Sequence, residues 1–263
     1  MMSKKPILTV HEVSMFFGGL KAVDDLSFTI NEKEIIGLIG PNGAGKTTVF
    51  NCVTQFYKKY TGTITYVNRD NKVINLKDYD VTKIASLGIA RTFQNIELIP
   101  DLSILDNVLI GAFNQFETKV IAHIFRTPKM RRQEKALTEK AENILKRLHI
   151  HHLKDMYVAG QPYGILKKVE LARALISDPR LIILDEPAAG LNDKETDELE
   201  ALVYQIRDEF NTTVLLIEHD MGLVMNLCDR VVAINFGKFL AYDTPQNIQK
   251  NPLVQEAYLG KDE

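Results

Sequence analysis

The chain has 263 residues, of which 45% are hydrophobic, so it can bury a core as one large domain or as one domain with a sizeable insertion. Its 32 basic and 34 acidic side chains nearly balance, which argues against a charged surface that would attract nucleic acid or an anionic membrane. No apolar run approaches a signal peptide or the roughly 20 residues of a membrane span, and Cys52 and Cys228 match no metal or redox spacing, so we expect a soluble, reduced, cytosolic protein.

The first third of the chain predicts strands around one helix. Residues 34–40 are apolar after Glu34, which is typical of a strand buried on both faces. Residues 47–57 predict a helix, and the two segments after it predict a hairpin. The predicted strands in this part are residues 7–13, 26–30, 34–40, 61–67, 72–76 and 89–94.

The middle of the chain is rich in predicted helices. Ser103 stands three residues before Asp106, a spacing typical of a helix start. Residues 129–150 have a strong helical pattern. The apolar residues on its predicted face are Leu137, Ala141, Ile144, Leu145 and Leu148. Because about residues 97–165 contain no obvious buried strand, we expect an inserted helical subdomain there.

The last third alternates helices with buried strands, which favours a mainly parallel sheet. A helix over residues 169–176 stops before Pro179, and strands are predicted over 181–186 and 212–219. A late hairpin is predicted over residues 230–242. The helix between the two strands has an apolar stripe formed by Leu199, Leu202, Val203, Ile206 and Phe210.

The segment that follows the predicted strand 34–40 has the pattern of a phosphate-binding loop, and it leads into a predicted helix. Glycines let the backbone N–H groups surround phosphate oxygens, and the helix N-terminus adds partial positive charge. Lys46 would reach the outer phosphates, and the Thr47 hydroxyl would hold Mg²⁺. The predicted nucleotide-contacting residues of the loop are Gly40, Pro41, Asn42, Gly43, Ala44, Gly45, Lys46, Thr47 and Thr48.

Acidic and polar residues stand at the ends of the later predicted strands, where an open parallel sheet binds ligands. Asp185 would hold Mg²⁺, and Glu186 would accept a proton from an attacking water. Both acids are also compatible with an ordinary solvated strand end. His219 ends the next buried strand, where a contact to the γ-phosphate competes with a plain surface role. Gln94, at the end of the 89–94 strand, carries little information by itself.

Taken in order, these segments resemble the ATP-binding cassette (ABC) ATPases over nearly the whole chain. The matching motifs are Walker A (GPNGAGKT), the Q-loop residue Gln94, the segment QPYGI in the place of the LSGGQ signature, Walker B (LIILDE), the D-loop Ala189–Asn192 and the H-loop residue His219. The resemblance implies an α/β P-loop NTPase of the ABC-ATPase fold, with a mainly parallel core sheet, an N-terminal antiparallel β subdomain and an inserted helical subdomain. Residues 1–263 would form one ABC ATPase domain, with its core over about 6–96 and 166–263.

The family also implies functional roles for individual residues. Lys46, Gln94, Glu186 and His219 would serve hydrolysis of ATP, with Mg²⁺ held by Thr47, Gln94 and Asp185. An aromatic residue stacks on adenine near the N-terminus in this family. Phe17 is the best match here, with Phe16 as the alternative.

The segments GIARTFQN, DLSILDNVLIGA, LDEPAAGLN and AYLG resemble more narrowly the ATPases of branched-chain amino-acid importers. The stretch between Ala112 and Glu134 is similar to the larger of the two ATPases in such systems. This implies a second ATPase subunit (or a homodimer when isolated), two membrane permease subunits and, indirectly, a substrate-binding protein, with no nucleic acid. The chain would lie peripherally on the inner face of the cell membrane.

Three alternatives stay open from the sequence. One is the ATPase of another ABC transporter, such as a lipopolysaccharide exporter, against which the insertion and the signature argue. Another is a soluble ABC protein acting on ribosomes or DNA, which normally has two cassettes or a long insertion. A third is a metal-binding role for His149, His151 and His152, for which a solvated helix end is the simpler interpretation.

The signature segment departs from LSGGQ. Four of its five positions differ, at Gln161, Pro162, Tyr163 and Ile165, and Gly164 is kept. Pro162 has neither a hydroxyl nor an N–H to donate. In this family the signature of one subunit covers the ATP of its partner, so Pro162, Tyr163 and Gly164 would contact the partner's nucleotide. If the partner carries a fuller signature, the two sites would be unequal, and our hypothesis is that most hydrolysis occurs at the site built on Lys46 and Glu186.

Overall fold

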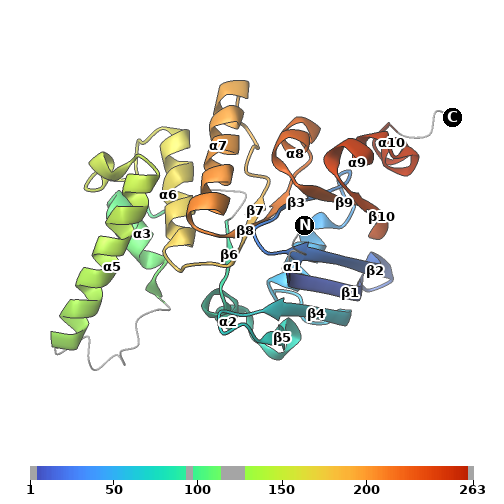
Figure 1. The fold of residues 1–263 in the computed structure, drawn as a ribbon, viewed down its shortest axis with the longest axis horizontal. Coiled ribbons are helices and arrows are strands. Elements are labelled where there is room, and N and C mark those ends of the chain that lie inside the picture. The colour runs from blue at the N-terminus through green and yellow to red at the C-terminus, as the bar shows by residue number, and fades with distance from the viewer. Residues whose placement is uncertain (1–4, 93–96, 114–127, 260–263) are drawn as a thin grey trace. The chain divides into compact units, whose positions relative to one another are not determined.

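The computed structural model describes residues 5–92, 97–113 and 128–259. The chain divides into two compact units. The first unit is formed by Met1–Ile89 and Arg180–Glu263, and the second unit by Ala90–Pro179. The second unit contains the helical segment expected from the sequence and extends beyond it on both sides. Figure 1 shows the two units as a sheet-rich part and a helical part.

One continuous sheet organises the first unit, in the order β5-β4-β1-β2-β10-β9-β3-β8-β7. Strand β3 pairs in parallel with β9 on one side and β8 on the other, and β8 pairs in parallel with β7. Strands β1, β2, β4 and β5 pair antiparallel. The strands are β1 (Pro6–Phe17), β2 (Leu20–Asn31), β3 (Ile35–Ile39), β4 (Thr61–Val67), β5 (Val73–Asn75), β7 (Leu181–Asp185), β8 (Thr213–Ile217), β9 (Arg230–Asn235) and β10 (Lys238–Asp243).

The predicted fold class is confirmed. Every residue of β3, β7 and β8 is buried, as expected for strands covered on both faces. The late hairpin is formed by β9 and β10, which pair antiparallel. The parallel strands carry their carboxyl ends to one edge of the sheet, and the polar residues that follow β3, β7 and β8 gather there.

The helices of the first unit pack on this sheet. Helix α7 packs on β8, and α9 packs on β9 and β10, as Figure 1 also shows. The α-helices are α1 (Lys46–Val53), α2 (Val81–Ile84), α7 (Asp193–Glu209), α8 (Met221–Leu227), α9 (Pro245–Lys250) and α10 (Pro252–Leu259). Short 3₁₀ turns cover Leu76–Asp78 and Ala85–Leu87. The last three α-helices were not among the sequence predictions, although Asp220 caps α8 and a proline begins α9.

The predicted helix 47–57 was too long. Helix α1 ends at Val53, because Gln55 adopts a left-handed φ of 60° that a helix cannot continue through. The Gln55 amide then donates to the carbonyl oxygen of Cys52 at 2.6 Å and to the Tyr60 hydroxyl at 2.9 Å. A side chain thus takes the place of the next turn of helix.

The second unit is helical. Its α-helices are α3 (Ile104–Ile110), α5 (Pro128–Arg147) and α6 (Tyr163–Leu175), with a 3₁₀ turn at His151–Leu153, and strand β6 (Ile89–Arg91) leads into the unit. The predicted start at Ser103 is confirmed, since its hydroxyl accepts from the Asp106 N–H at 3.0 Å. Helix α5 ends earlier than the predicted Ile150, because His149 has a φ of 59°. Of its predicted apolar face, Leu137 is partly buried and the other four residues, Ala141, Ile144, Leu145 and Leu148, are buried.

None of the helices in the described ranges has the length and apolar character needed to cross a membrane.

Candidate functional site

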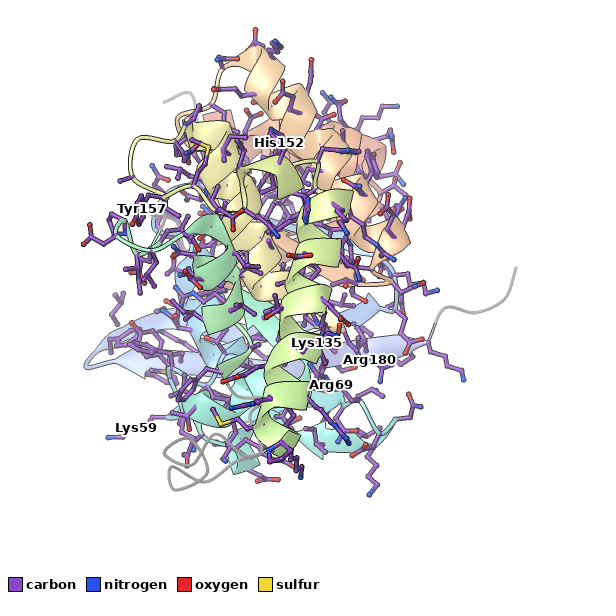
Figure 2. All side chains as sticks on the ribbon, turned by 90° about the vertical axis from the view of Figure 1, so that its left-hand side faces the viewer. Lys59, Arg69, Lys135, His152, Tyr157 and Arg180 are labelled. Carbon is purple, nitrogen blue, oxygen red and sulfur yellow. The ribbon has the colours of Figure 1, made fainter. Side chains whose placement is uncertain are left out.

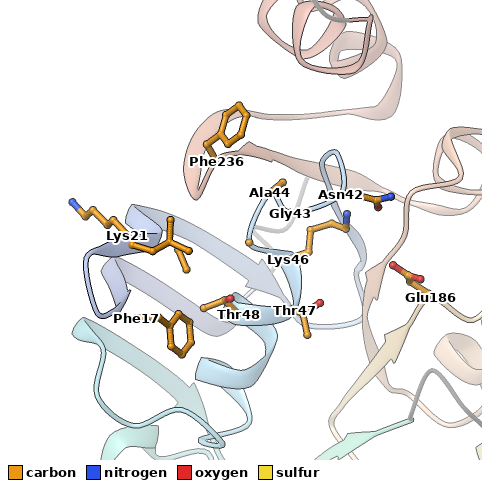
Figure 3. A pocket seen from close by; sticks show the side chains of 13 residues that line it. Phe17, Lys21, Asn42, Gly43, Ala44, Lys46, Thr47, Thr48, Glu186 and Phe236 are labelled. Carbon is orange, nitrogen blue, oxygen red and sulfur yellow. The ribbon is translucent and has the colours of Figure 1, made fainter.

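A pocket of about 380 Å³ lies at the carboxyl end of β3 in the first unit. Figure 3 shows the phosphate loop in the centre of this pocket, with Lys46, Thr47 and Glu186 around it. The lining residues are Phe17, Leu20, Lys21, Ala22, Asn42, Gly43, Ala44, Gly45, Lys46, Thr47, Thr48, Glu186 and Phe236. The structure therefore brings the predicted residues 42–48 together with Glu186, which lies 138 positions after Thr48 in the chain.

Two glycines of the loop are required by the close packing of the loop against β9 and β2. A Cβ on Gly40 would lie 2.3 Å from the carbonyl oxygen of Ile234. A Cβ on Gly45 would lie 2.5 Å from the carbonyl oxygen of Ala22, and Gly45 has a φ of 103°. Helix α1 begins directly after Gly45, so its first unpaired N–H groups lie at the pocket. This arrangement is a ready anion site.

Lys46 lies in this loop with 6% of its surface exposed. Its ammonium donates to the carbonyl oxygen of Gly40 at 2.7 Å and to that of Pro41 at 3.2 Å. Burial lowers the pKa of Lys46, while the carboxylates of Glu186, Glu218 and Asp185 act in the opposite direction. The cation is thus held among carbonyls and acids, where an anion can replace the weaker carbonyl acceptors.

The end of β7 supplies two acids. Asp185 is the last residue of the strand and is 8% exposed, and Glu186 follows it with a left-handed φ of 46°. Such a backbone costs on the order of 1 kcal/mol for a residue other than glycine. It orients the Glu186 carboxylate toward the pocket, where Oε1 lies 3.8 Å from Nδ1 of His219. The His219 side chain is 54% exposed at the tip that follows β8.

The donor set around the loop fits Mg²⁺. This ion prefers oxygen ligands and usually takes one or two from the protein, with phosphates and waters completing its shell. Thr47 lines the pocket, and the Asp185 carboxylate is close enough to oppose, through its charge, the lowering of the Lys46 pKa by burial. Gln94, the third expected ligand and an expected catalytic residue, lies outside the described residues.

Three aromatic residues stand near the mouth of the pocket. Phe17 lines it, with its ring 5.1 Å from that of Tyr57 in an edge-to-face contact. Phe16, the alternative, is not among the lining residues and lies beside the Lys21 ammonium. Phe236 also lines the pocket, and the sequence analysis missed it. The turn between β9 and β10 carries it there, and the signal was the Asn-Phe-Gly sequence of that turn, where Phe236 has a φ of 46°.

The signature segment lies in the second unit, at the start of α6. Pro162 precedes the helix and offers no side-chain cap. Tyr163 is 37% exposed, and a Cβ on Gly164 would meet no atom within 4 Å. Figure 2 shows Tyr157 projecting from the loop that leads to this segment, and Tyr157 is 65% exposed. The segment thus presents a small residue and aromatic rings at its surface.

Two other sequence features add no site. Within the described ranges, no group of three or more His, Cys, Asp or Glu side chains is placed to hold a metal ion, so the three histidines after α5 form no such site. The stretch between Ala112 and Glu134 lies largely outside the described residues, which resume at residue 128.

Comparison with known proteins gives concordant matches. Residues 23–189 match the ABC transporter family. The chain is 42% identical over 257 residues to the high-affinity branched-chain amino acid transport ATP-binding protein LivG of Salmonella typhimurium, covering 98% of this chain and 99% of that one. It is 43% identical over 257 residues to the corresponding protein BraF of Pseudomonas aeruginosa, with the same coverage. A crystal structure of a nucleotide-free ATP-binding cassette from an ABC transporter superposes with a TM-score of 0.81 at 30% identity, covering 97% of this chain and 100% of that chain.

Proposed function

The chain belongs to the ABC transporter family, and from that premise we propose that it is the ATP-binding and ATP-hydrolysing subunit of a branched-chain amino-acid importer. The observation that carries the proposal is that Lys46, Thr47 and Glu186 line the same pocket. Relatives that span nearly the whole chain are branched-chain amino acid transport proteins, which favours this function over lipopolysaccharide export.

The chemistry proposed for the pocket is phosphoryl transfer from ATP to water. The loop N–H groups and Lys46 bind and neutralise the phosphates, and Phe17 stacks on the base. Glu186 orients or deprotonates the attacking water, and His219, 3.8 Å from it, contacts the γ-phosphate. Thr47 and Asp185, together with Gln94, would hold Mg²⁺, which would supply charge neutralisation at the phosphates when bound.

The work of the transporter comes from closure of two such subunits around ATP. In this proposal Pro162, Tyr163 and Gly164 approach the ATP of the partner ATPase, and the partner's signature approaches the ATP on Lys46. ATP holds the closed pair, and hydrolysis removes the bridging γ-phosphate contact. Gln94 and the second unit transmit the change to two membrane permease subunits, which keep the chain at the inner face of the membrane.

The proposal is tested by what the chain binds in the cell. The tagged chain is purified from native membranes in mild detergent, and its partners are identified by mass spectrometry. We expect two hydrophobic permease subunits and a second, shorter ATPase. Recovery with ribosomes, nucleic acid or export machinery would contradict the transport assignment while leaving the ATPase chemistry intact.

A second test measures amino-acid uptake by cells. Cells that lack the chain should lose uptake of leucine, isoleucine and valine. The wild-type chain should restore uptake, whereas Glu186→Gln, which keeps the fold but lacks the base, should not. Uptake restored equally by both versions would contradict the link between hydrolysis and transport.

A further inference from the structure

Glu218, the residue between β8 and His219, is fully buried at the edge of the candidate site. A buried carboxylate is costly unless hydrogen bonds satisfy it, so its partners indicate its role. It does not line the pocket, and with 0% exposure it cannot reach the reacting water itself.

The two oxygens of this carboxylate accept from two different loops. Oε1 accepts from the N–H of Ala188, in the loop between β7 and α7, at 2.9 Å. Oε2 accepts from the N–H groups of His219 and Asp220, which follow β8, at 3.1 and 3.4 Å. Burial raises the pKa of Glu218, and these three N–H groups act in the opposite direction.

Each of these loops carries one of the proposed catalytic residues. Ala188 lies two residues after Glu186, whose left-handed backbone is also held by its N–H to the carbonyl oxygen of Ile217 at 2.9 Å. The Ala189 N–H returns to the Glu186 carbonyl at 3.2 Å and closes the turn. Glu218 therefore spans the two backbone segments that set the 3.8 Å separation of Glu186 and His219.

We propose that Glu218 is a positioning residue for ATP hydrolysis, which holds the loop of Glu186 and the loop of His219 in register through its two carboxylate oxygens. The inference rests on the proposed function of this site. It requires both oxygens as acceptors and the full length of the side chain, because each oxygen accepts from a different loop.

A positioning role and a purely electrostatic one differ in what they require of the side chain. The charge of Glu218 opposes the lowering of the Lys46 pKa by burial, and its Oε2 lies 3.8 Å from Nδ1 of His219, so a variant that keeps the charge would keep an electrostatic role. A positioning role acts on the reaction step, because a shift of about 1 Å in a catalytic group can cost on the order of 100-fold in rate while binding is spared.

The test uses the transporter assembly purified through a tag on this chain. Glu218→Gln is nearly isosteric but offers an N–H₂ where one loop needs an acceptor. We expect kcat to fall about 10- to 100-fold, with the dissociation constant of a fluorescent ATP analogue within about twofold of wild type. Glu218→Asp keeps the charge but is one methylene shorter, and it should lower kcat in the same way.

Glu34→Gln is the matched control. Glu34 is 2% exposed and accepts from the Asn31 N–H at 2.8 Å, before β3 and thus at the end opposite the phosphate loop. This variant should lower Tm about as much as Glu218→Gln and leave kcat within about twofold of wild type.

The outcomes separate this inference from the function on which it rests. If Glu218→Gln changes kcat no more than Glu34→Gln does, while Glu186→Gln abolishes turnover, the positioning role is wrong and the ATPase function stands. If Glu218→Asp keeps wild-type kcat, charge and not reach is what matters, which also overturns the proposal. A wild-type assembly without ATPase activity would overturn both.

Discussion

In the phosphate loop, a Cβ on Gly40 would lie 2.3 Å from a backbone oxygen of the same chain, whereas a Cβ on Gly164 in the signature segment would meet nothing within 4 Å. The side chains of the two regions also differ in how far they are exposed. Lys46 is buried and paired to loop carbonyls, while Tyr163 beside Gly164 is partly exposed. Packing within the chain thus requires a glycine in the phosphate loop, whereas it does not require one in the signature segment.

This difference agrees with the proposed positions of the two ligand contacts. The phosphate loop is complete within the chain, since its glycines, its lysine and Glu186 share one pocket. The open surface at Gly164 leaves room for a group from outside the chain, which agrees with our proposal that it approaches the partner's ATP. The experiments below act on one region at a time.

The largest effect is expected at Glu186. Replacing it with Gln removes the proposed base but keeps the size of the side chain, so turnover should fall about 10²- to 10⁴-fold. ATP binding should remain, because Lys46 and the loop N–H groups are untouched. Steady-state ATPase rates and equilibrium binding of a fluorescent ATP analogue measure the two quantities. Wild-type turnover in this variant would remove Glu186 from the mechanism.

The same substitution in the partner ATPase tests whether the two ATP sites contribute unequally to turnover. Because the signature of this chain lacks donors at Pro162, we expect the corresponding Glu→Gln change in the partner to lower turnover less than Glu186→Gln does. Equal losses from the two single variants would refute the proposed inequality of the sites.

A smaller effect is expected at Lys46. Lys46→Ala removes a buried cation from the phosphate-binding loop, and a charge-assisted hydrogen bond is worth about 1.5–3 kcal/mol, so affinity for ATP should fall about 10- to 100-fold. Lys21→Ala is the control, because Lys21 lines the same pocket but pairs with Asp24. It should leave affinity within about twofold. Unchanged affinity in Lys46→Ala would count against the phosphate-binding role.

The phosphate loop was predictable from the sequence because its determinants are local. A fully apolar strand, a glycine-rich turn and a helix start lie within adjacent residues, and the same holds for the cap at Ser103. The Asn-Phe-Gly sequence signals the turn that carries Phe236, but the position of that turn at the loop was not predictable, since it depends on the pairing of β9 with β3. Nor was the burial of Glu218, which depends on two loops closing over one carboxylate.

In the signature segment, Gly164→Ala should separate stability from activity. Gly164 lies in the first turn of α6 with open space around it, so alanine should leave stability unchanged or raise it by up to about 0.5–1 kcal/mol. Turnover of the assembled pair should nevertheless fall about two- to tenfold, because the added methyl group occupies the surface proposed for the partner's ATP. Thermal unfolding and ATPase rates are compared with wild type.

Gly111→Ala is the matched control for that experiment. A Cβ on Gly111 would lie 1.9 Å from the carbonyl oxygen of Arg173, where α3 meets α6, so this variant should be clearly destabilised. If Gly164→Ala is destabilised to the same degree, or if it keeps full turnover, the proposed exposure of this glycine to a partner is wrong.

The smallest effects are expected at two helix caps, one in each unit. The Asn192 side chain accepts from the Glu195 N–H at 3.1 Å at the start of α7, and Ser103 accepts from the Asp106 N–H at 3.0 Å at the start of α3. Replacing either residue with Ala should cost about 1 kcal/mol and lower Tm by about 2–4 °C. Turnover at saturating ATP should not change in either variant. Asn192 ends the segment that resembles the D-loop and belongs to the unit that contains the pocket, whereas Ser103 belongs to the helical unit. Turnover that falls in Asn192→Ala but not in Ser103→Ala would therefore mean that Asn192 contributes to the site as well as to the helix. The functional region around the phosphate loop would then include the D-loop.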